Sequence, residues 1–364
     1  MTARPVPPQA PRPQVLLCGY YGEHNLGDDA LLQVLLSQLP AGVEPLVTAA
    51  DRAAVEAAFR VATVDRRRLG EVLRALPGCQ ALVLGGGSLL QDSTSFRSLV
   101  YYGALITAAW LRGLPVLLWG QGLGPLRRRR SRLLARGLLA MASAISWRDP
   151  ASARLAGSWG IDAGQGSDPV WALPPQDWQG PGGPIILCWR PVAGLDDRGW
   201  RLLLAAINAV AERCDRPLHW LPFHQDQDTD LLADLDRRGL LSASLRRRSL
   251  VVQVSTPEQA MQQFRGASLV VAMRLHGLIL AALSGSPCVA LSYDPKVKAA
   301  AGSLGCPCLD LGRLPHGEPA ADAEALAASW QALVDQPPDQ SRCERLRAET
   351  RVHAELLQRL QAIA

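Results

Sequence analysis

Lysine is almost absent from this chain of 364 residues. Of its 38 basic residues only two are lysines, Lys296 and Lys298, and the rest are arginines. Arginine offers a planar fork for carboxylates and phosphates, whereas lysine offers a mobile point charge. The isolated pair of lysines therefore stands out as a candidate functional feature.

A large excess of charge is also absent. The formal net charge is +5, and 48% of the residues are hydrophobic. This balance is typical of a globular protein and excludes a disordered chain or a general nucleic-acid binder. The length suffices for two domains with separate cores.

Long hydrophobic runs are missing too. The most apolar stretch runs from Leu99 to Leu111 before Arg112 interrupts it, which is short of the roughly 20 residues of a spanning helix. The first 14 residues are rich in proline and have no apolar core, so they do not resemble a signal peptide. We therefore expect a cytoplasmic protein, with any membrane contact at the inner face.

Cysteine pairs with the spacing of a zinc site are absent as well. The eight cysteines form no CxxC motif, and Cys18 and Cys188 lie in apolar runs. Such cysteines are typical of small buried side chains in a reducing compartment. We expect no metal site and no cofactor.

Apolar strands alternate with helices along the chain. In the first half, strands are expected from Val15, at 81–84, from Pro115 and at 144–147, with helices between them, the first at about 28–39. The stretch after Gly87 is expected to pass into a helix. A second alternating series begins at Pro184. This pattern predicts an α/β protein of two Rossmann-like domains with parallel sheets and a ligand cleft between them.

The boundaries between the expected domains are inferred from the local amino-acid composition. A segment rich in proline and glycine, 174–184, reads as an interdomain linker, and the last charged amphipathic stretch reads as a terminal helix. The predicted parts are a disordered lead-in (1–13), an N-terminal domain (14–179), a linker (180–184), a C-terminal domain (185–340) and a terminal helix (341–364).

Three glycine-bearing loops follow strands of the first half, at 19–30, 85–91 and 120–125. Glycines let a backbone approach a ligand, and a helix start offers free N–H groups. Asp28 alone fits equally well as a helix N-cap. Together the loops favour a site for a polyhydroxy compound, with His24 and Asp29 as possible bases. The candidate substrate-binding residues are Asn25, Asp28, Gly86, Ser88, Gln91 and Gln121.

Basic residues follow strands of the second half. Arg190 comes directly after one apolar strand, Arg274 and His276 follow another, and Lys296 lies just beyond a third. The motif around Lys296 also fits a solvated turn made by Asp294 and Pro295. We expect these four residues to form a compact cationic pocket for a small polyanion.

The motifs together resemble a known family. GYYG followed by NLGDDA, then GGGSLLQD, GQGLGP, SWRDPAS, MRLHGLILAALSGSP and SYDPKVK occur in that order over roughly residues 15–310. This series resembles the CsaB-type polysaccharide pyruvyl transferases. The chain departs from the family pattern at Glu23 and His24, and at Asp29, where glutamate is usual. These departures lie on the side expected to hold the sugar.

The resemblance implies a fold like that of the B-type glycosyltransferases, with phosphoenolpyruvate as the donor. It implies that Arg190, Arg274, His276 and Lys296 hold this co-substrate. The N-terminal loops would hold the acceptor, a cell-wall or capsular sugar that is expected to be linked to a lipid.

We expect His276 or Lys296 to handle the proton or the departing phosphate, and Asp28 or Asp29 to deprotonate or orient a sugar hydroxyl. A sugar-nucleotide glycosyltransferase of the same fold is the alternative enzyme. No acidic residue of the second half stands out as its ribose binder, and Glu258 and Asp294 are the only candidates. A catalytically inert sugar-binding protein is a third interpretation. The basic run Arg127–Arg132 fits a contact with anionic headgroups or a solvated helix face.

Overall fold

The structure is a computed structural model that describes residues 12–92, 95–314 and 319–363. Nearly all of the lead-in expected at 1–13 lies outside the described residues. The chain divides into two compact units. Unit 1 comprises residues 1–22, 35–166 and 351–364, and unit 2 comprises residues 23–34 and 167–350.

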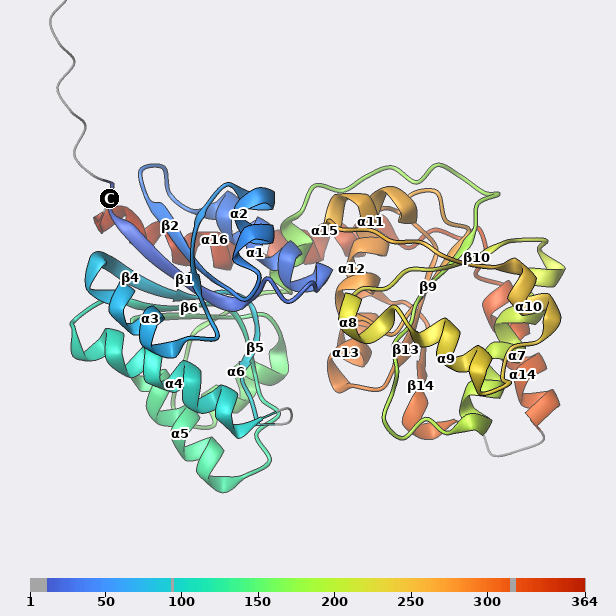
Figure 1. Ribbon diagram of the computed structural model, residues 1–364, viewed down its shortest axis with the longest axis horizontal. Helices are drawn as coiled ribbons and strands as arrows, with labels where there is room; N and C mark the ends of the chain where they lie inside the picture. Colours follow the sequence, from blue (N-terminus) through green and yellow to red (C-terminus); the bar gives the residue numbers. More distant parts are fainter. Residues whose placement is uncertain (1–11, 93–94, 315–318, 364) are drawn as a thin grey trace, which may run out of the picture. The chain divides into compact units, whose positions relative to one another are not determined.

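Unit 1 is built on an all-parallel sheet (Figure 1). Its strand order is β3-β2-β1-β4-β6-β7-β8, and β5 pairs with β6. The interior strands are buried because helices cover both faces of a parallel sheet. The strands are β1 (Gln14–Tyr21), β2 (Glu44–Ala49), β3 (Ala62–Asp65), β4 (Cys79–Leu84), β5 (Gly87–Leu90), β6 (Val116–Leu123), β7 (Ala144–Trp147) and β8 (Gly164–Gln165).

The helices of unit 1 connect successive strands, except for those at the end of the chain. The connecting helices are α2 (Arg52–Phe59), α3 (Leu69–Ala75), η1 (Leu76–Gly78), α4 (Phe96–Leu111), α5 (Arg129–Ala140) and α6 (Pro150–Gly157); α16 (Arg351–Leu357) and η4 (Gln358–Ile363) return from the C-terminus. The helix α1 (Leu26–Gln38) begins in unit 2 and ends in unit 1.

Unit 2 contains a second all-parallel sheet, of strand order β11-β10-β9-β12-β13-β14. The strands are β9 (Ile185–Cys188), β10 (Leu218–Trp220), β11 (Ser249–Val251), β12 (Leu269–Ala272), β13 (Cys288–Ser292) and β14 (Cys308–Asp310). The helices are η2 (Pro169–Ala172), α7 (Asp197–Arg213), α8 (Gln225–Asp228), α9 (Leu231–Arg237), α10 (Ala243–Arg248), α11 (Pro257–Phe264), α12 (Leu275–Leu283), α13 (Pro295–Leu304), η3 (Leu311–Arg313), α14 (Pro319–Gln331) and α15 (Gln340–Glu349).

The two units therefore do not follow a single division of the chain. Residues 23–34 and 167–179 pack within unit 2, although composition placed the boundary near 180–184. The last residues, from Arg351, return to unit 1. The expected terminal helix at 341–364 is interrupted at Thr350, with α15 in unit 2 and α16 in unit 1.

One further element differs from the expectation. The apolar stretch after Gly87 does not pass directly into a helix, because it first forms β5, which pairs with β6 at Gly87–Gln121 and Leu90–Leu123. In the described part of the chain no helix is both long enough and apolar enough to cross a bilayer.

Candidate active site

The first turn of α1 is anchored on the loop and helix that follow β10, within unit 2. The Leu26 N–H donates to the Phe223 carbonyl at 3.0 Å, and the Gln225 N–H donates to the His24 carbonyl at 3.0 Å. Between them, Asn25 and His224 form an isolated antiparallel bridge. The second half of the first glycine-bearing loop therefore belongs to unit 2, beside the residues that follow β10.

Asn25 caps α1. Its Oδ1 accepts the Gly27 N–H at 3.1 Å, and its Nδ2 donates to Asp28 Oδ2 at 2.5 Å. The interpretation of Asp28 as the N-cap is therefore wrong, because Asp28 lies inside the first turn. Acidic side chains at this end of a helix are favoured by the helix dipole.

The carboxyl group of Asp29 has a strongly raised pKa. Burial raises the pKa of its carboxyl group to about 7, and the neighbouring Asp28 carboxylate adds to the shift. Both causes disfavour the charged form. A carboxyl group with this pKa exchanges a proton near neutral pH, which suits a general acid or base.

His276 lies in the first turn of α12 and is held close to α1. A Cβ atom added at Gly27 would lie 2.1 Å from His276 Nδ1 and 2.8 Å from its Cγ. Only a glycine allows α1 to approach the imidazole this closely. The structure thus brings Asn25, Asp28 and His276 into one neighbourhood of unit 2.

Asp168 faces the other side of this imidazole. Its Oδ2 lies 3.5 Å from His276 Nε2, and the side chains of the two residues are 8% and 14% exposed. The distance suits an ion pair with a protonated imidazole, but it is too long for a direct hydrogen bond at this nitrogen. Sequence reasoning missed Asp168, although its position before Pro169 marks a helix start and its Oδ1 caps η2 through the Val170 N–H.

Arg274 is held by a buried carboxylate. Its Nε donates to Asp228 Oδ2 at 3.0 Å and its Nη2 donates to Asp228 Oδ1 at 2.5 Å. The Asp228 side chain is fully buried and also accepts the N–H groups of Phe223 and His224. Arg274 is therefore a fixed, charge-paired guanidinium, and its buried partner was not anticipated from the sequence.

Three basic residues follow neighbouring strands at one edge of the sheet. The order β9-β12-β13 makes the carboxyl ends of these strands adjacent. Arg190 and Arg274 lie two residues after β9 and β12, and Lys296 lies four residues after β13. Arg190 donates from Nη1 to the Tyr293 hydroxyl at 3.0 Å and packs over the Tyr293 ring. The topology therefore places all three at the edge where open α/β sheets bind ligands.

Lys296 lies in a helix, and not in a turn made by Asp294 and Pro295. The Asp294 side chain accepts the Lys296 N–H at 2.9 Å and caps α13. Lys296 is half-buried in the first turn, where the positive end of the helix dipole adds to its charge. Both features favour an anionic ligand.

His224 is a buried histidine of this unit that sequence reasoning missed. It is 5% exposed, and neither ring nitrogen has a hydrogen-bond partner in the described part of the chain. Burial lowers the pKa of His224, and the nearby Arg274 charge lowers it further. The imidazole is therefore neutral at neutral pH. The backbone of the same residue forms the bridge to Asn25.

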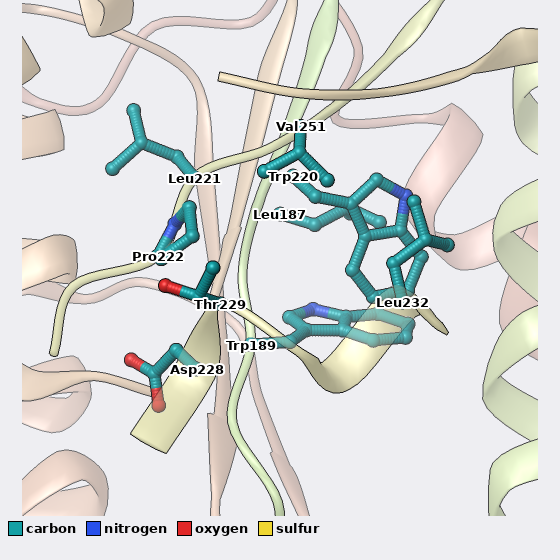
Figure 2. A pocket seen from close by; sticks show the side chains of 9 residues that line it. All are labelled: Leu187, Trp189, Trp220, Leu221, Pro222, Asp228, Thr229, Leu232 and Val251. Atoms are coloured by element: carbon teal, nitrogen blue, oxygen red, sulfur yellow. The ribbon is translucent and has the colours of Figure 1, made fainter. Parts of the chain in front are cut away.

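A small pocket lies at the ends of β9 and β10 (Figure 2). The rings of Trp189 and Trp220 line one side of it, and Asp228 and Thr229 line another. The two rings pack edge to face, with centroids 5.5 Å apart. Asp228, the partner of Arg274, therefore borders a pocket whose other side is apolar.

The other predicted residues lie in unit 1. Ser88 lies in β5 and accepts a hydrogen bond from Arg148 Nη2 at 3.1 Å, and Gly86 comes just before this strand. Gln121 is fully buried, and its amide group donates to the carbonyls of Leu84 and Gly85. Gln121 therefore ties β6 to the end of β4. The loop expected at 120–125 is wrong in its first part, because β6 continues to Leu123. Gln91 is half-buried at the end of β5.

The two candidate ribose binders make contacts within unit 2. Asp294 is used as the cap of α13, and Glu258 is an exposed residue that accepts a hydrogen bond from Gln33. In residues 12–92, 95–314 and 319–363, no group of three or more His, Cys, Asp or Glu side chains could hold a metal ion.

Solved structures define the class of this fold. The chain aligns over 96% of its length with 99% of a UDP-GlcNAc 2-epimerase from Methanocaldococcus jannaschii, at TM-score 0.61 and 11% identity. It aligns over 95% with 99% of MurG from Acinetobacter baumannii, at TM-score 0.54 and 14% identity. These likenesses confirm a fold of two Rossmann-like units, of the B-type glycosyltransferase kind.

The sequence defines the family. The family model described as polysaccharide pyruvyl transferase matches residues 25–295, so the chain belongs to that family. No curated protein sequence matches the chain. The expected resemblance is thereby confirmed. The matched residues include the first turn of α1, His224, His276, Arg190 and Arg274, and they end one residue before Lys296.

Proposed function

We propose that the chain transfers the pyruvyl group of phosphoenolpyruvate to a sugar, forming a cyclic ketal and releasing phosphate. The observation that carries this proposal is the position of His276 against the first turn of α1, with Asp29 in the same turn. The polysaccharide pyruvyl transferase family supports the transfer of this group to a polysaccharide.

The donor would bind at the strand ends of unit 2. Phosphoenolpyruvate carries a carboxylate and a phosphate, which suit Arg190, Lys296 and the N-terminus of α13. Arg274 would present its guanidinium in the orientation that Asp228 holds. The expected cationic pocket is thus proposed with the Arg274 guanidinium held by a buried carboxylate. Phosphoenolpyruvate acts here as a co-substrate, and no cofactor is proposed.

The reaction needs a proton donor and a base. A proton delivered to C3 of the donor makes C2 electrophilic, one sugar hydroxyl adds to C2, and the C–O bond to phosphate breaks. A second hydroxyl then closes the ring. The two hydroxyl protons are balanced by the new methyl group and the released phosphate. We assign proton delivery to His276 or Lys296, and proton removal to Asp29 or Asp28.

The acceptor would be a sugar of a cell-wall or capsular polysaccharide, linked to a lipid and presented at the cytoplasmic face of the membrane. Asn25 lies beside the proposed donor site. Gly86, Ser88 and Gln91 remain candidates in unit 1, with Gln121 supporting their loop.

Calorimetry with phosphoenolpyruvate and, separately, UDP-GlcNAc tests the donor. We expect phosphoenolpyruvate to bind, and Lys296→Ala to weaken it by tenfold or more. Lys298→Ala is the matched control, because Lys298 is an exposed lysine of the same helix and pairs with Asp310 at 3.1 Å. Arg274→Ala is a poor probe, since it would leave the Asp228 carboxylate buried without its partner.

Binding of UDP-GlcNAc in place of phosphoenolpyruvate would favour the glycosyltransferase alternative. If the Lys296→Ala protein bound phosphoenolpyruvate as tightly as the unmodified protein, the proposed donor site would be refuted. Turnover is tested by phosphate release with a panel of acceptor sugars. Unchanged release by both His276→Ala and Lys296→Ala would overturn their assigned roles.

A further inference from the structure

We propose that the outer surface of α4 and α5 in unit 1 is a docking surface for a membrane that contains anionic phospholipid. We define this α4–α5 surface as the exposed side chains of residues 96–140. The inference is drawn from unit 1 alone and goes beyond the pyruvyl chemistry proposed for unit 2.

The charge of the α4–α5 surface has a single sign. Residues 96–140 contain eight of the 38 basic residues of the chain and none of its 33 acidic residues. All eight basic residues are exposed arginines, at positions 97, 112, 127, 128, 129, 130, 132 and 136. The rest of the chain is slightly acidic, with 30 basic and 33 acidic residues, so this surface is the source of the positive net charge.

The same surface exposes large apolar side chains. Among the described residues, seven large hydrophobic side chains are exposed, and four of them belong to α4 and α5. They are Val100 (47% exposed), Trp110 (51%), Leu111 (69%) and Leu133 (71%). A merely solvated basic helix gains nothing from apolar residues, whereas tryptophan and leucine among arginines are typical of segments that lie in a membrane interface.

Contacts show that the two helices run side by side in the same direction (Figure 1). Near their N-termini the Arg130 guanidinium packs over the Phe96 ring, at 4.3 Å from its centroid. Near their C-termini the Thr107 hydroxyl contacts the Met141 sulfur. The arginines and the exposed apolar residues therefore extend along one continuous surface.

The packing of α5 directs its arginines outward. Ser131, Ala135, Leu138 and Leu139 face the core, and the opposite side of the helix carries Arg129, Leu133 and Arg136. The side chains of Arg127, Arg129 and Arg136 make no hydrogen bond or ion pair within the described residues. The loop before α5 is held instead through its backbone, where Asp92 accepts the N–H groups of Arg127 and Arg128. The fold therefore does not depend on pairing by these side chains, and they can be changed without unfolding the protein.

The test is flotation of the full-length protein with vesicles of phosphatidylcholine, alone or with phosphatidylglycerol at about a third of the lipid. We expect binding only to the anionic vesicles, and release by high salt, since added salt screens exposed charges. The triple variant Arg127→Glu, Arg129→Glu, Arg136→Glu should bind more than roughly 100-fold more weakly, because each basic residue near an anionic surface strengthens binding about fivefold.

Matched variants separate this surface from net charge. The triple variant Arg201→Glu, Arg237→Glu, Arg247→Glu changes exposed arginines of unit 2 by the same amount and should bind normally. Replacing Arg127, Arg129 and Arg136 by lysine should preserve binding.

Trp110→Ser with Leu133→Ser should weaken binding roughly tenfold. Leu250→Ser is the control, because Leu250 is an exposed apolar side chain of unit 2 (57%).

Equal binding to neutral and anionic vesicles would overturn the proposal, as would an equal loss in the unit 2 triple variant. An RNA that binds as tightly as the anionic vesicles, together with unaffected binding by the serine variants, would assign the surface to nucleic acid instead. The assay contains no phosphoenolpyruvate, so its failure leaves the proposed transferase activity standing, and loss of that activity leaves the membrane surface standing.

Discussion

At the scale of single residues, Gly27 packs so closely against His276 that no Cβ atom fits between them. This contact joins two residues that lie far apart in the sequence. The contact depends on the absence of a side chain at position 27. It therefore offers a direct test of whether α1 positions the imidazole.

Gly27→Ala should lower the free energy of unfolding by about 1–3 kcal/mol, because the new methyl group overlaps the imidazole. Denaturant unfolding measures this change. Gly302→Ala is the matched control, since a Cβ atom there meets no atom within 4 Å inside α13. It should stabilise the protein by up to about 1 kcal/mol. If the steric account is right, His276→Ala should restore most of the stability that Gly27→Ala loses.

The acidity of Asp29 leads to a prediction about pH. Its pKa is about 7 in the folded protein and about 4 in an unfolded chain. Between these values the folded state binds more protons, so this group makes the protein less stable as the pH rises from about 4 to 7. Asp29→Asn removes the effect. The variant should match the unmodified protein near pH 4 and be more stable by on the order of 3 kcal/mol at pH 8.

Thermal unfolding at both pH values measures the difference. Asp230→Asn, at an exposed aspartate of the same unit, should show no such trend. A stability gain that is equal at both pH values would contradict the shifted acidity of Asp29.

At the scale of elements, one dipeptide marks three helix starts. Asp149–Pro150, Asp168–Pro169 and Asp294–Pro295 open α6, η2 and α13, and each aspartate caps its helix. Proline suits the first helical position because no N–H is needed there. The cap at Asp294 also fixes the turn that carries Lys296.

Asp294→Ala should cost about 1 kcal/mol of stability and should also weaken phosphoenolpyruvate binding, because the turn that carries Lys296 loses its cap. Asp149→Ala removes the same kind of cap in unit 1. It should cost similar stability and leave binding unchanged. Calorimetry on the two variants compares them directly, and equal affinities would show that the cap does not position Lys296.

At the scale of the whole molecule, the chain enters each unit more than once. After α15 it returns to unit 1, where His353 is fully buried and its Nδ1 lies 2.8 Å from Ser146 Oγ. The same hydroxyl accepts the Gly120 N–H at 2.9 Å. The C-terminal segment therefore completes the core of unit 1 beside β6 and β7.

His353→Ala should destabilise unit 1 by about 2–3 kcal/mol, because it leaves a cavity and a buried hydroxyl with one partner fewer. Hydrogen exchange should accelerate in β6 and β7, while β12 and β13 of unit 2 keep their protection. Glu355→Ala, at an exposed position of α16, should change neither. Uniform acceleration in both units would refute the assignment of this segment to unit 1.

Much of the fold and part of the site could be predicted from the sequence by itself. Alternating apolar runs predicted the parallel strands, because a strand buried on both faces has a local composition that can be read directly. The same runs placed Arg190, Arg274 and His276 at strand ends. Local sequence could not predict that Asp228 pairs with Arg274, that Asp168 faces His276, or that residues 23–34 belong to unit 2. Those depend on which distant segments pack together, and only the tertiary structure decided them, because burial and pairing are properties of the packed core and not of any single stretch of chain.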